Sequence, residues 1–216
     1  MLKIDLHTHS NHSPDGGISQ DQYAHIFENG ILDFVAVTDH NSIAQAQKLH
    51  KLFGDRIIVG SEIMSRDGEI IGLFLSENIR SGQSAKATID AIHAQGALVY
   101  LPHPLETVRK GVSMQTMEVC KQDIDIVEAF NGRAVFQNRG PETTVWARLN
   151  RKPMAASSDA HSMKGVGTAF TMISQKPTAK NLAGQLRTAR RSTRRPPLLS
   201  LLSPKINRLV QKMSKD

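Results

Sequence analysis

Residues 1–10, MLKIDLHTHS, join a short apolar run to a pair of histidines. In a β-strand the side chains of residues i and i+2 lie on the same face, so His7 and His9 point the same way. Four similar clusters follow brief apolar runs further along the chain: Thr38-Asp39-His40-Asn41, Gly60-Ser61-Glu62, Pro102-His103-Pro104 and Ser158-Asp159-Ala160-His161. Neutral imidazole and carboxylate are the usual protein ligands for Zn²⁺, Mn²⁺ and Fe²⁺. The five clusters together predict a polynuclear metal site.

The apolar runs alternate with helical patterns, which predicts an α/β fold built from parallel β-α-β units. Strands are expected at residues 2–7, 33–38, 56–62, 69–75, 97–101, 125–130, 153–157 and 168–173, and the run at 69–75 carries no ligand. Helices are expected at 19–28 and 42–52, each opened by a capping box (Ser19 with Gln22, Ser42 with Gln45), at 84–95, and at 136–149, where Pro141 is a candidate interruption. Ligands at the carboxyl ends of successive strands are typical of the active site of an α/β barrel.

Length and composition fit one barrel-sized domain, or one domain with a tail. The chain has 216 residues, of which 39% are hydrophobic. Its single cysteine, Cys120, excludes an internal disulfide and suits a reducing compartment. The N-terminal residues lack the apolar stretch of a secretory signal, and no run approaches the roughly 20 apolar residues of a membrane span. We therefore expect a cytoplasmic protein.

The positive charge is concentrated near the C-terminus. Residues 187–216 carry nine Lys or Arg and one acid, a formal balance of +8, whereas residues 1–186 hold 18 bases and 19 acids, a balance of −1. We therefore expect a catalytic domain over 1–186 and a basic, partly amphipathic tail over 187–216. The apolar residues of the tail recur at helical spacing: Leu198, Leu199, Leu202, Ile206, Leu209, Val210 and Met213.

A basic amphipathic segment of this kind packs on its own body or on a second subunit, lies on an anionic membrane, or contacts nucleic acid. We expect packing, through the Leu198–Met213 stripe, and keep the other partners open. Because the body is close to neutral, we also expect the tail to govern location or affinity and to leave the chemistry alone.

Glu62 is the expected bridge between two metal ions. A hydrolytic centre with ions roughly 3.5–4 Å apart needs a bridging carboxylate, and Glu62 stands alone at a predicted strand end. Asp159 and His161 are again at i and i+2, so both can face the pocket. Asp39 and His40 are adjacent and point opposite ways in extended chain. We therefore expect His40 to bind metal and Asp39 to orient an imidazole from behind.

The motifs DLHTHS, TDHN, GSE, PHP and SDAH, in this order, resemble those of the polymerase and histidinol phosphatase (PHP) superfamily. The resemblance covers residues 1–179 and is closest to the small stand-alone phosphoesterases of that superfamily. It implies a distorted seven-stranded β/α barrel, similar to a TIM barrel. It also implies two or three divalent metal ions, commonly manganese, zinc or iron, and the hydrolysis of phosphoesters.

The resemblance further implies which residues bind metal. One ion would take His7, His9, Glu62 and Asp159, a second would share Glu62 and add His103, and a third would take Asp15, His40 and His161. Asp15 lies in the loop SPDGG, residues 13–17, which resembles an SDG element of the superfamily. Its histidine-rich members supply a further histidine near residues 128–131, where this chain has Asn131 instead.

Arg109, Arg133 and Asn131 are the candidate substrate-binding residues. A guanidinium binds phosphate through two hydrogen bonds, although each arginine also fits a solvated surface position. We expect attack on phosphorus by a metal-bound hydroxide, with Glu62, Asp159 and His161 as catalytic residues. His161 or His40, where not committed to metal, would protonate the leaving oxygen.

The expected substrate is a nucleotide, a nucleoside bisphosphate or an oligonucleotide end. Glu62 and His103 are only 41 positions apart, which leaves little room for a cap over the pocket, so long substrates and small sugar phosphates both stay open. Two other functions also stay open, a non-catalytic accessory module and a phosphatase of a small metabolite such as histidinol phosphate. So many buried ionisable groups argue against the first, and the missing histidine near Asn131 argues against the second.

Overall fold

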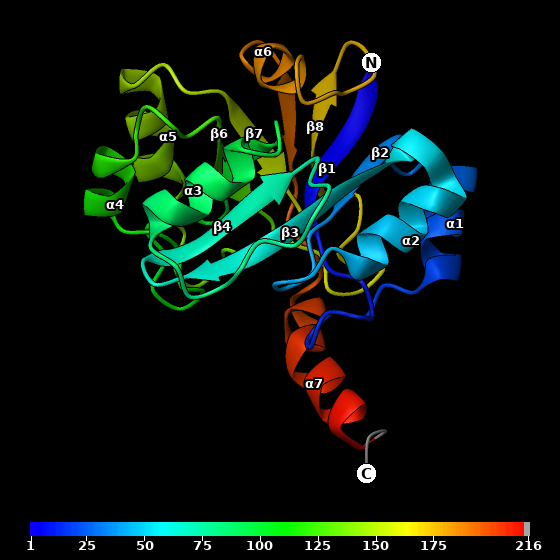
Figure 1. The fold of residues 1–216 in the computed structure, drawn as a ribbon. Helices are drawn as coiled ribbons and strands as arrows, with labels where there is room; N and C mark the ends of the chain where they lie inside the picture. The colour runs from blue at the N-terminus through cyan, green and yellow to red at the C-terminus, as the bar shows by residue number, and fades with distance from the viewer. Residues whose placement is uncertain (214–216) are drawn as a thin grey trace.

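One curled sheet of nine strands forms the body of the protein (Figure 1). The structure is a computed structural model that describes residues 1–213. Across the sheet the strands follow the order β7-β6-β5-β4-β3-β2-β1-β8-β9. Their bounds are Leu2–Thr8 (β1), Phe34–Val37 (β2), Ile57–Ser65 (β3), Gly68–Leu73 (β4), Leu98–Leu101 (β5), Ile126–Asn131 (β6), Met154–Ser157 (β7), Ala169–Ile173 (β8) and Arg190–Thr193 (β9). The fold is therefore α/β, as expected, with a nearly closed, barrel-like sheet.

The strands form a mixture of parallel and antiparallel pairs. β1, β2 and β3 run in one direction, as do β5, β6 and β7, whereas β4 is antiparallel to both of its neighbours. β8 is antiparallel to β1, and β9 is antiparallel to β8. The sheet thus departs from the expected seven strands and from purely parallel units. β9 escaped the sequence analysis because a polar, charged edge strand shows no apolar run.

The helices of the described chain are α1 (Gln20–Glu28), α2 (Ala44–Phe53), α3 (Ala85–His93), α4 (Met114–Val119), α5 (Gly140–Leu149), α6 (Leu182–Leu186) and α7 (Ser203–Met213), with 3-10 turns at Gly54–Arg56 and Leu198–Leu202. The capping box of Ser19 and Gln22 is confirmed at α1. The capping box expected from Ser42 and Gln45 does not form. Helix α2 begins after Ile43, and the Ser42 hydroxyl accepts a hydrogen bond from the Ala44 N–H instead. Among residues 1–213 no helix is long and apolar enough to cross a membrane.

Pro141 opens α5 and does not interrupt it. The expected helix over 136–149 starts only at Gly140, so Pro141 stands in its first turn. A proline is tolerated there because the N–H groups of the first turn have no partner within the helix.

Buried aliphatic side chains fill the inside of the curled sheet. One cluster joins Ile4 on β1, Ile71 on β4 and Ile126 on β6, which are not neighbours in the sheet and meet across its interior. A second cluster packs the sheet against α1 and α2, and a third packs it against α3, α4 and α5. The apolar core therefore supports the strands along their length, while the buried polar side chains gather at one end of the barrel.

A side-chain hydroxyl spans the seam between β7 and β8, where the sheet curls round on itself. Thr171 Oγ1 on β8 accepts from the Ala156 N–H at 2.9 Å and donates to the Ala156 carbonyl at 3.1 Å. Just beyond β7, the N–H and hydroxyl of Ser158 both donate to the carboxylate of Asp5 on β1. These bonds hold the end of β7 against β1, and they bring the first and last of the expected site clusters together.

Replacing Thr171 by valine should destabilise the protein, because the N–H and carbonyl of Ala156 lose their partner inside the seam. A buried polar group without a partner costs about 1–3 kcal/mol, so the free energy of unfolding measured in urea should fall by about that amount. Thr193→Val is the matched control, because Thr193 is exposed on β9, and it should change little. Equal stability of the two variants would show that the seam does not need the hydroxyl.

Candidate metal centre

Four side chains from distant parts of the chain converge at one end of the barrel. His9 Nε2 lies 3.3 Å from Glu62 Oε2 and 3.5 Å from Asp159 Oδ1. His7 Nε2 lies 3.5 Å and 3.6 Å from the same two oxygens, and 3.1 Å from His9 Nε2. Ligands placed about 2.0–2.2 Å from a tetrahedral ion are separated from one another by about 3.4 Å. The two imidazoles therefore lie at ligand spacing from each other and from both carboxylates, and the expected convergence of the four side chains is observed.

Asp15, His40 and His161 form a second group next to His9. Asp15 Oδ2 lies 3.6 Å from His40 Nε2 and 3.5 Å from His161 Nε2. The rings of His9 and His161 are 4.2 Å apart between their centroids, and one donor atom from each of the four residues lies within 4.8 Å of all the others. The structure thus brings together the set that the resemblance implied for a third ion.

A third group contains Glu69, which the sequence analysis passed over. His103 Nε2 lies 3.0 Å from Glu62 Oε1 and 3.7 Å from Glu69 Oε2, and His40 Nδ1 lies 3.7 Å from Glu69 Oε1. Glu62 pairs with Ile71 in the antiparallel β3–β4 ladder, and Glu69 precedes Ile71 by two residues, so both carboxylates share one face. Nothing in the sequence placed a residue of this strand at the site, because β4 runs antiparallel to β3. Its first residues, not its last, lie at the site.

Glu128 on β6 braces the site from behind. It lies 3.2 Å from His7 Nδ1 and accepts hydrogen bonds from the Tyr100 hydroxyl (2.9 Å), the His103 N–H (2.6 Å) and Asn131 Nδ2 (2.8 Å). A carboxylate at Nδ1 fixes the tautomer of an imidazole and leaves Nε2 free to bind a metal. In the sequence, residues 128–131 stand out only because they lack the histidine found there in other members of the superfamily. Glu128 was missed because a single acid inside an apolar strand gives no motif.

Asp39 does not orient an imidazole, contrary to expectation. Its carboxylate accepts from the Ser10 N–H at 2.7 Å and from the Ser10 hydroxyl, and its carbonyl accepts from the Ser61 hydroxyl at 3.0 Å. Asp39 therefore ties the segments that follow β1 and β2 to β3. Side chains alternate in extended chain, so the sequence predicted that Asp39 faces away from His40. The sequence did not predict that Ser10 is the partner of Asp39.

Three residues at these strand ends have positive φ angles: Asn41 (54°), His103 (28°) and Asp159 (53°). Such backbone conformations in residues other than glycine cost of order 1–3 kcal/mol each and cluster at functional sites. His103 and Asp159 are both expected ligands. The fold therefore holds two candidate metal-binding side chains in place against the preference of their own backbone.

Glu62 and the imidazoles around it stabilise one another's charges. Burial by itself raises the pKa of Glu62, but His7, His40 and His103 outweigh burial and hold that pKa well below its usual range. Burial lowers the pKa of His9, but Asp159 and Glu62 outweigh it and raise that pKa to about 9.

Glu69 shows the opposite balance. Burial and the neighbouring Glu62 carboxylate raise the pKa of Glu69 to about 9. Carboxylates buried this close together need a cation among them, and nitrogen and oxygen donors at these spacings suit a divalent metal ion. The donor set therefore fits the metals that the resemblance implied.

Arg109 and Arg133 both reach the site and both approach Asp159. Arg109 Nη1 donates to Asp159 Oδ2 at 2.8 Å and to Asn131 Oδ1 at 2.6 Å. Arg133 Nη1 lies 3.5 Å from Asp159 Oδ1 and 3.2 Å from His161 Nδ1. The alternative of solvated surface arginines is thus wrong for both. Asn131 is buried beside Asp159 and is not among the residues that line the cavity.

A cavity of about 660 Å³ opens over these groups. Acids and bases share its lining, which includes Asp15, Glu62, Glu69 and Asp159 together with Arg109, Lys110, Arg133, Lys205 and Arg208. Lys205 and Arg208 belong to α7, which projects from this end of the barrel (Figure 1). The lining of the cavity therefore combines four acidic side chains with five basic ones.

Polar side chains fasten α7 to the loops of the site. Asn207 Nδ2 donates to the carbonyls of Asp15 and His161, both at 2.9 Å, and Arg208 Nη2 donates to Asp15 Oδ2 at 2.7 Å. A Cβ at Gly17 would lie 2.7 Å from Asn207 Nδ2, so this close approach requires the glycine. The tail therefore contacts the loops that carry Asp15 and His161, and the expectation that it leaves the chemistry alone stays a prediction. These contacts were not foreseen because Asn207 and Arg208 have the pattern of a solvated helix face.

Residues 144–190 match a family model described as PHP-associated. The fold resembles that of a two-domain protein from Bacteroides vulgatus containing a predicted PHP-like metal-dependent phosphoesterase, with a TM-score of 0.70, 21% identity and coverage of 89% of this chain. The chain belongs to the PHP superfamily. This PHP chain spans 65% of the length of the Bacteroides protein.

The chain is also similar to proteins whose names do not mention this superfamily. An amidohydrolase structure from Chromobacterium violaceum, with bound sulfate and no metal, has a TM-score of 0.59 at 14% identity and covers 93% of this chain and 96% of its own. Two uncharacterized proteins of Methanocaldococcus jannaschii, MJ1587 and MJ0417, are 37% and 32% identical over 143 and 184 residues. Those matches cover 60% and 81% of this chain, and 82% and 71% of the relatives. The named structural neighbours are hydrolases.

Metal binding should release protons and tighten as pH rises. Because Asp159 and Glu62 raise the pKa of His9 to about 9, the His9 ring carries an extra proton near pH 7 in the metal-free protein. A metal ion must displace that proton, so affinity should increase from pH 6 to pH 8. Calorimetric titration with Mn²⁺ in buffers of different ionisation enthalpy measures the release. If the measured heat of Mn²⁺ binding is the same in all buffers, no proton is released and the prediction is wrong.

Proposed function

We propose that this PHP chain is a metal-dependent phosphoesterase acting on a nucleotide, a nucleoside bisphosphate or an oligonucleotide end. The observation that carries the proposal is the surroundings of Asp159. His7 and His9 approach it at metal-ligand spacing and approach Glu62 in the same way. Arg109 and Arg133 approach Asp159 as well. Manganese, zinc or iron bound there would activate water and neutralise the charge of a phosphate. The two arginines would bind the non-bridging oxygens of that phosphate.

Glu62 would bridge two ions, because its two oxygens face different groups. Oε2 faces His7, His9 and His40 at 3.3–3.5 Å, while Oε1 faces His103 at 3.0 Å. We propose that Glu69 takes part in the second ion's sphere with Glu62 and His103, in place of the histidine that other members supply near residue 131. Asp15, His40 and His161 would hold a third ion.

His161 suits metal binding better than proton donation. Burial, together with His9 and Arg133, lowers the pKa of His161 to about 4. The ring is therefore neutral at pH 7 and offers a lone pair, whereas a general acid must carry a proton at the working pH. His40 would protonate the leaving oxygen only where it is not bound to the third ion, and its side chain is partly exposed in the lining of the cavity.

The mouth of the cavity favours a substrate with more than one anionic group. Arg109 and Arg133 contact Asp159, whereas Lys110, Lys205 and Arg208 line the cavity from other segments. A nucleoside bisphosphate or an oligonucleotide end has a second phosphate to meet these bases, and histidinol phosphate has none. The accessory-module alternative is disfavoured because two strained ligand positions and a desolvated acid cluster reduce stability without any benefit to packing.

Replacing Glu62 by glutamine should lower turnover more than about a hundredfold, because an amide bridges two cations far less well than a carboxylate. The assay is release of inorganic phosphate from a nucleoside 3′,5′-bisphosphate in the presence of Mn²⁺. Glu142→Gln on the exposed face of α5 is the control and should keep its rate. Turnover like that of the natural chain in Glu62→Gln, with metals still bound, would refute the bridge.

Replacing Glu69 by glutamine should lower the metal content by roughly one ion per chain, because the second ion exchanges an anionic carboxylate for a weakly binding neutral amide. Elemental analysis of the purified protein measures this directly, with Glu77→Gln as the control at an exposed position. An unchanged metal content with unchanged turnover would exclude Glu69 from the centre.

A further inference from the structure

The helix α7 has two opposite faces, and the barrel uses only the polar one. Pro204, Asn207, Arg208 and Gln211 recur at i, i+3, i+4 and i+7 and face the loops of the site. Residues at this spacing form one side of a helix. In addition to the bonds of Asn207 and Arg208, Gln211 Nε2 donates to the Ser13 carbonyl at 2.9 Å.

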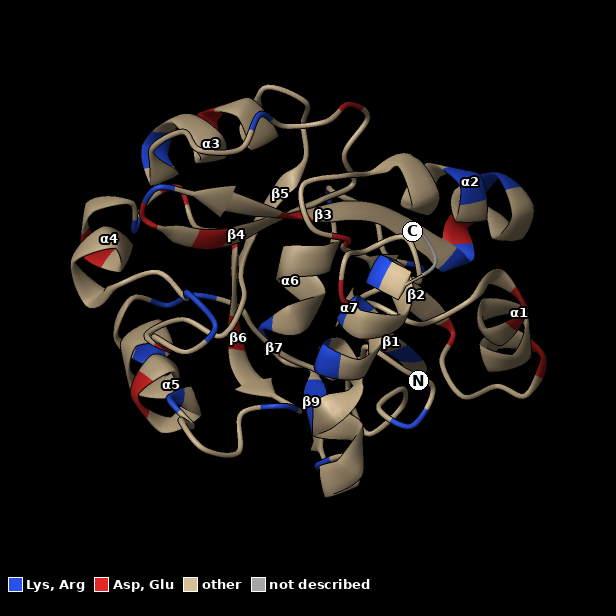
Figure 2. Cartoon of the chain, turned by 90° about the horizontal axis from the view of Figure 1, so that it is seen from below, with Lys and Arg blue, Asp and Glu red and all other residues tan. Residues whose placement is uncertain are grey.

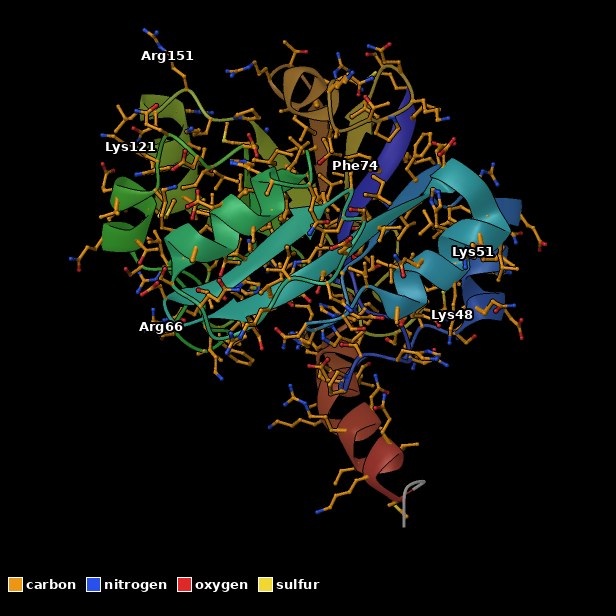
Figure 3. All side chains as sticks on the ribbon, viewed as in Figure 1. Lys48, Lys51, Arg66, Phe74, Lys121 and Arg151 are labelled. Atoms are coloured by element: carbon orange, nitrogen blue, oxygen red, sulfur yellow. The ribbon has the colours of Figure 1, made fainter. Side chains whose placement is uncertain are left out.

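The opposite face is an exposed apolar stripe. Ile206, Leu209, Val210 and Met213 have the same spacing, shifted by two residues, and are 53–78% exposed. Leu198, Leu199 and Leu202 in the preceding 3-10 turn extend the stripe and are 47–74% exposed. Figure 3 shows the side chains of α7 projecting beyond the body, where no other described element faces them. A surface helix normally turns its apolar face inward, so this arrangement marks an interaction surface.

The charge of the segment indicates the kind of partner. Residues 187–213 contain eight Lys or Arg and no acid, and Figure 2 shows blue and no red on α7. A twofold contact with a second copy would set this basic segment against itself, since such an interface uses the same patch on both subunits. Nucleic acid would match the charge but would leave the apolar stripe in water.

An anionic bilayer matches both properties. Apolar side chains of an amphipathic helix enter the boundary between headgroups and acyl chains, while Lys and Arg contact the lipid phosphates. Lys205 and Lys212 lie beside the stripe on the exposed part of α7, and Arg194 and Arg195 are exposed just before it. Helix length is no obstacle, because a helix that lies in the interface need not span the membrane.

We propose that α7 and the Leu198–Leu202 turn dock this protein on an anionic lipid surface. The stripe lies in the headgroup region, and the polar face stays on the barrel. Because Asn207 and Arg208 hold α7 against the loops of Asp15 and His161, docking sets the mouth of the cavity beside the membrane. The contact is reversible and sensitive to salt, since one short amphipathic segment anchors a protein only weakly.

The test is flotation of the full chain with phosphatidylcholine vesicles that contain or lack phosphatidylglycerol. The natural chain should bind the anionic vesicles at least about tenfold more strongly than the neutral ones, and added salt should weaken this binding. Leu209→Asp with Val210→Asp should abolish it. Val145→Asp with Leu149→Asp, at similarly exposed apolar positions on α5, should not.

A second pair of variants tests the contribution of the basic side chains to vesicle binding. Arg194→Glu with Lys212→Glu, at exposed positions outside the lining of the cavity, should reduce binding to anionic vesicles at least about tenfold. Lys48→Glu with Lys51→Glu, an equal change of charge on α2 (Figure 3), should have little effect. A Leu209→Trp variant gives a second readout, because its emission should shift to the blue on anionic vesicles while Trp146 stays buried.

Three outcomes would overturn the proposal. The first is that the natural chain does not bind anionic vesicles. The second is a dimer, detected by sedimentation, that the Leu209/Val210 variant dissociates while no chain floats with vesicles, which would assign the stripe to a second copy. The third is binding to oligonucleotides alone that survives in the Leu209/Val210 variant, which would assign the basic charge to nucleic acid. None of these outcomes depends on turnover, so vesicle binding is judged separately from the phosphoesterase activity.

Discussion

The buried carboxylate of Glu62 is the constraint on which the rest of the site depends. Four imidazole rings surround it at 3.0–3.5 Å, and they come from β1, from the segments after β1 and β2, and from the segment after β5. A desolvated carboxylate is stable only with cationic or hydrogen-bonding partners. The curled sheet supplies them by bringing several strand ends to one place, and a metal centre is the chemistry that such a cluster suits.

The residues that stabilise the fold lie apart from the residues of the candidate metal centre. Aliphatic clusters hold the strands together along the barrel, whereas the end that carries the site accumulates unfavourable features. His103 and Asp159 have positive φ angles, and the carboxyls of Glu62 and Glu69 lie close enough to raise the pKa of Glu69. A sequence selected for packing alone would avoid both. Their presence at one end of an otherwise regular core is typical of a site maintained for function.

The sequence predicts those features of the site that depend on residues close together in the chain. His7 and His9 alternate along one strand, and Asp159 and His161 repeat that spacing, so their shared direction could be inferred from the chain alone. Glu69 could not be inferred, because its place depends on β4 running antiparallel to β3. The docking of Asn207 and Arg208 on the site loops is likewise a long-range contact between polar groups, and hydrophobic periodicity gives no sign of it. Local pattern thus predicted the ligands, and topology decided their neighbours.

The central claim is that His7, His9, Glu62 and Asp159 hold a catalytic metal ion. The most direct test is anomalous scattering at the manganese edge from crystals grown with Mn²⁺. The account predicts a peak within about 2.0–2.3 Å of all four donors, and a second peak across Glu62 toward His103 and Glu69. An active, metal-replete crystal whose anomalous peaks lie away from Glu62 would contradict it.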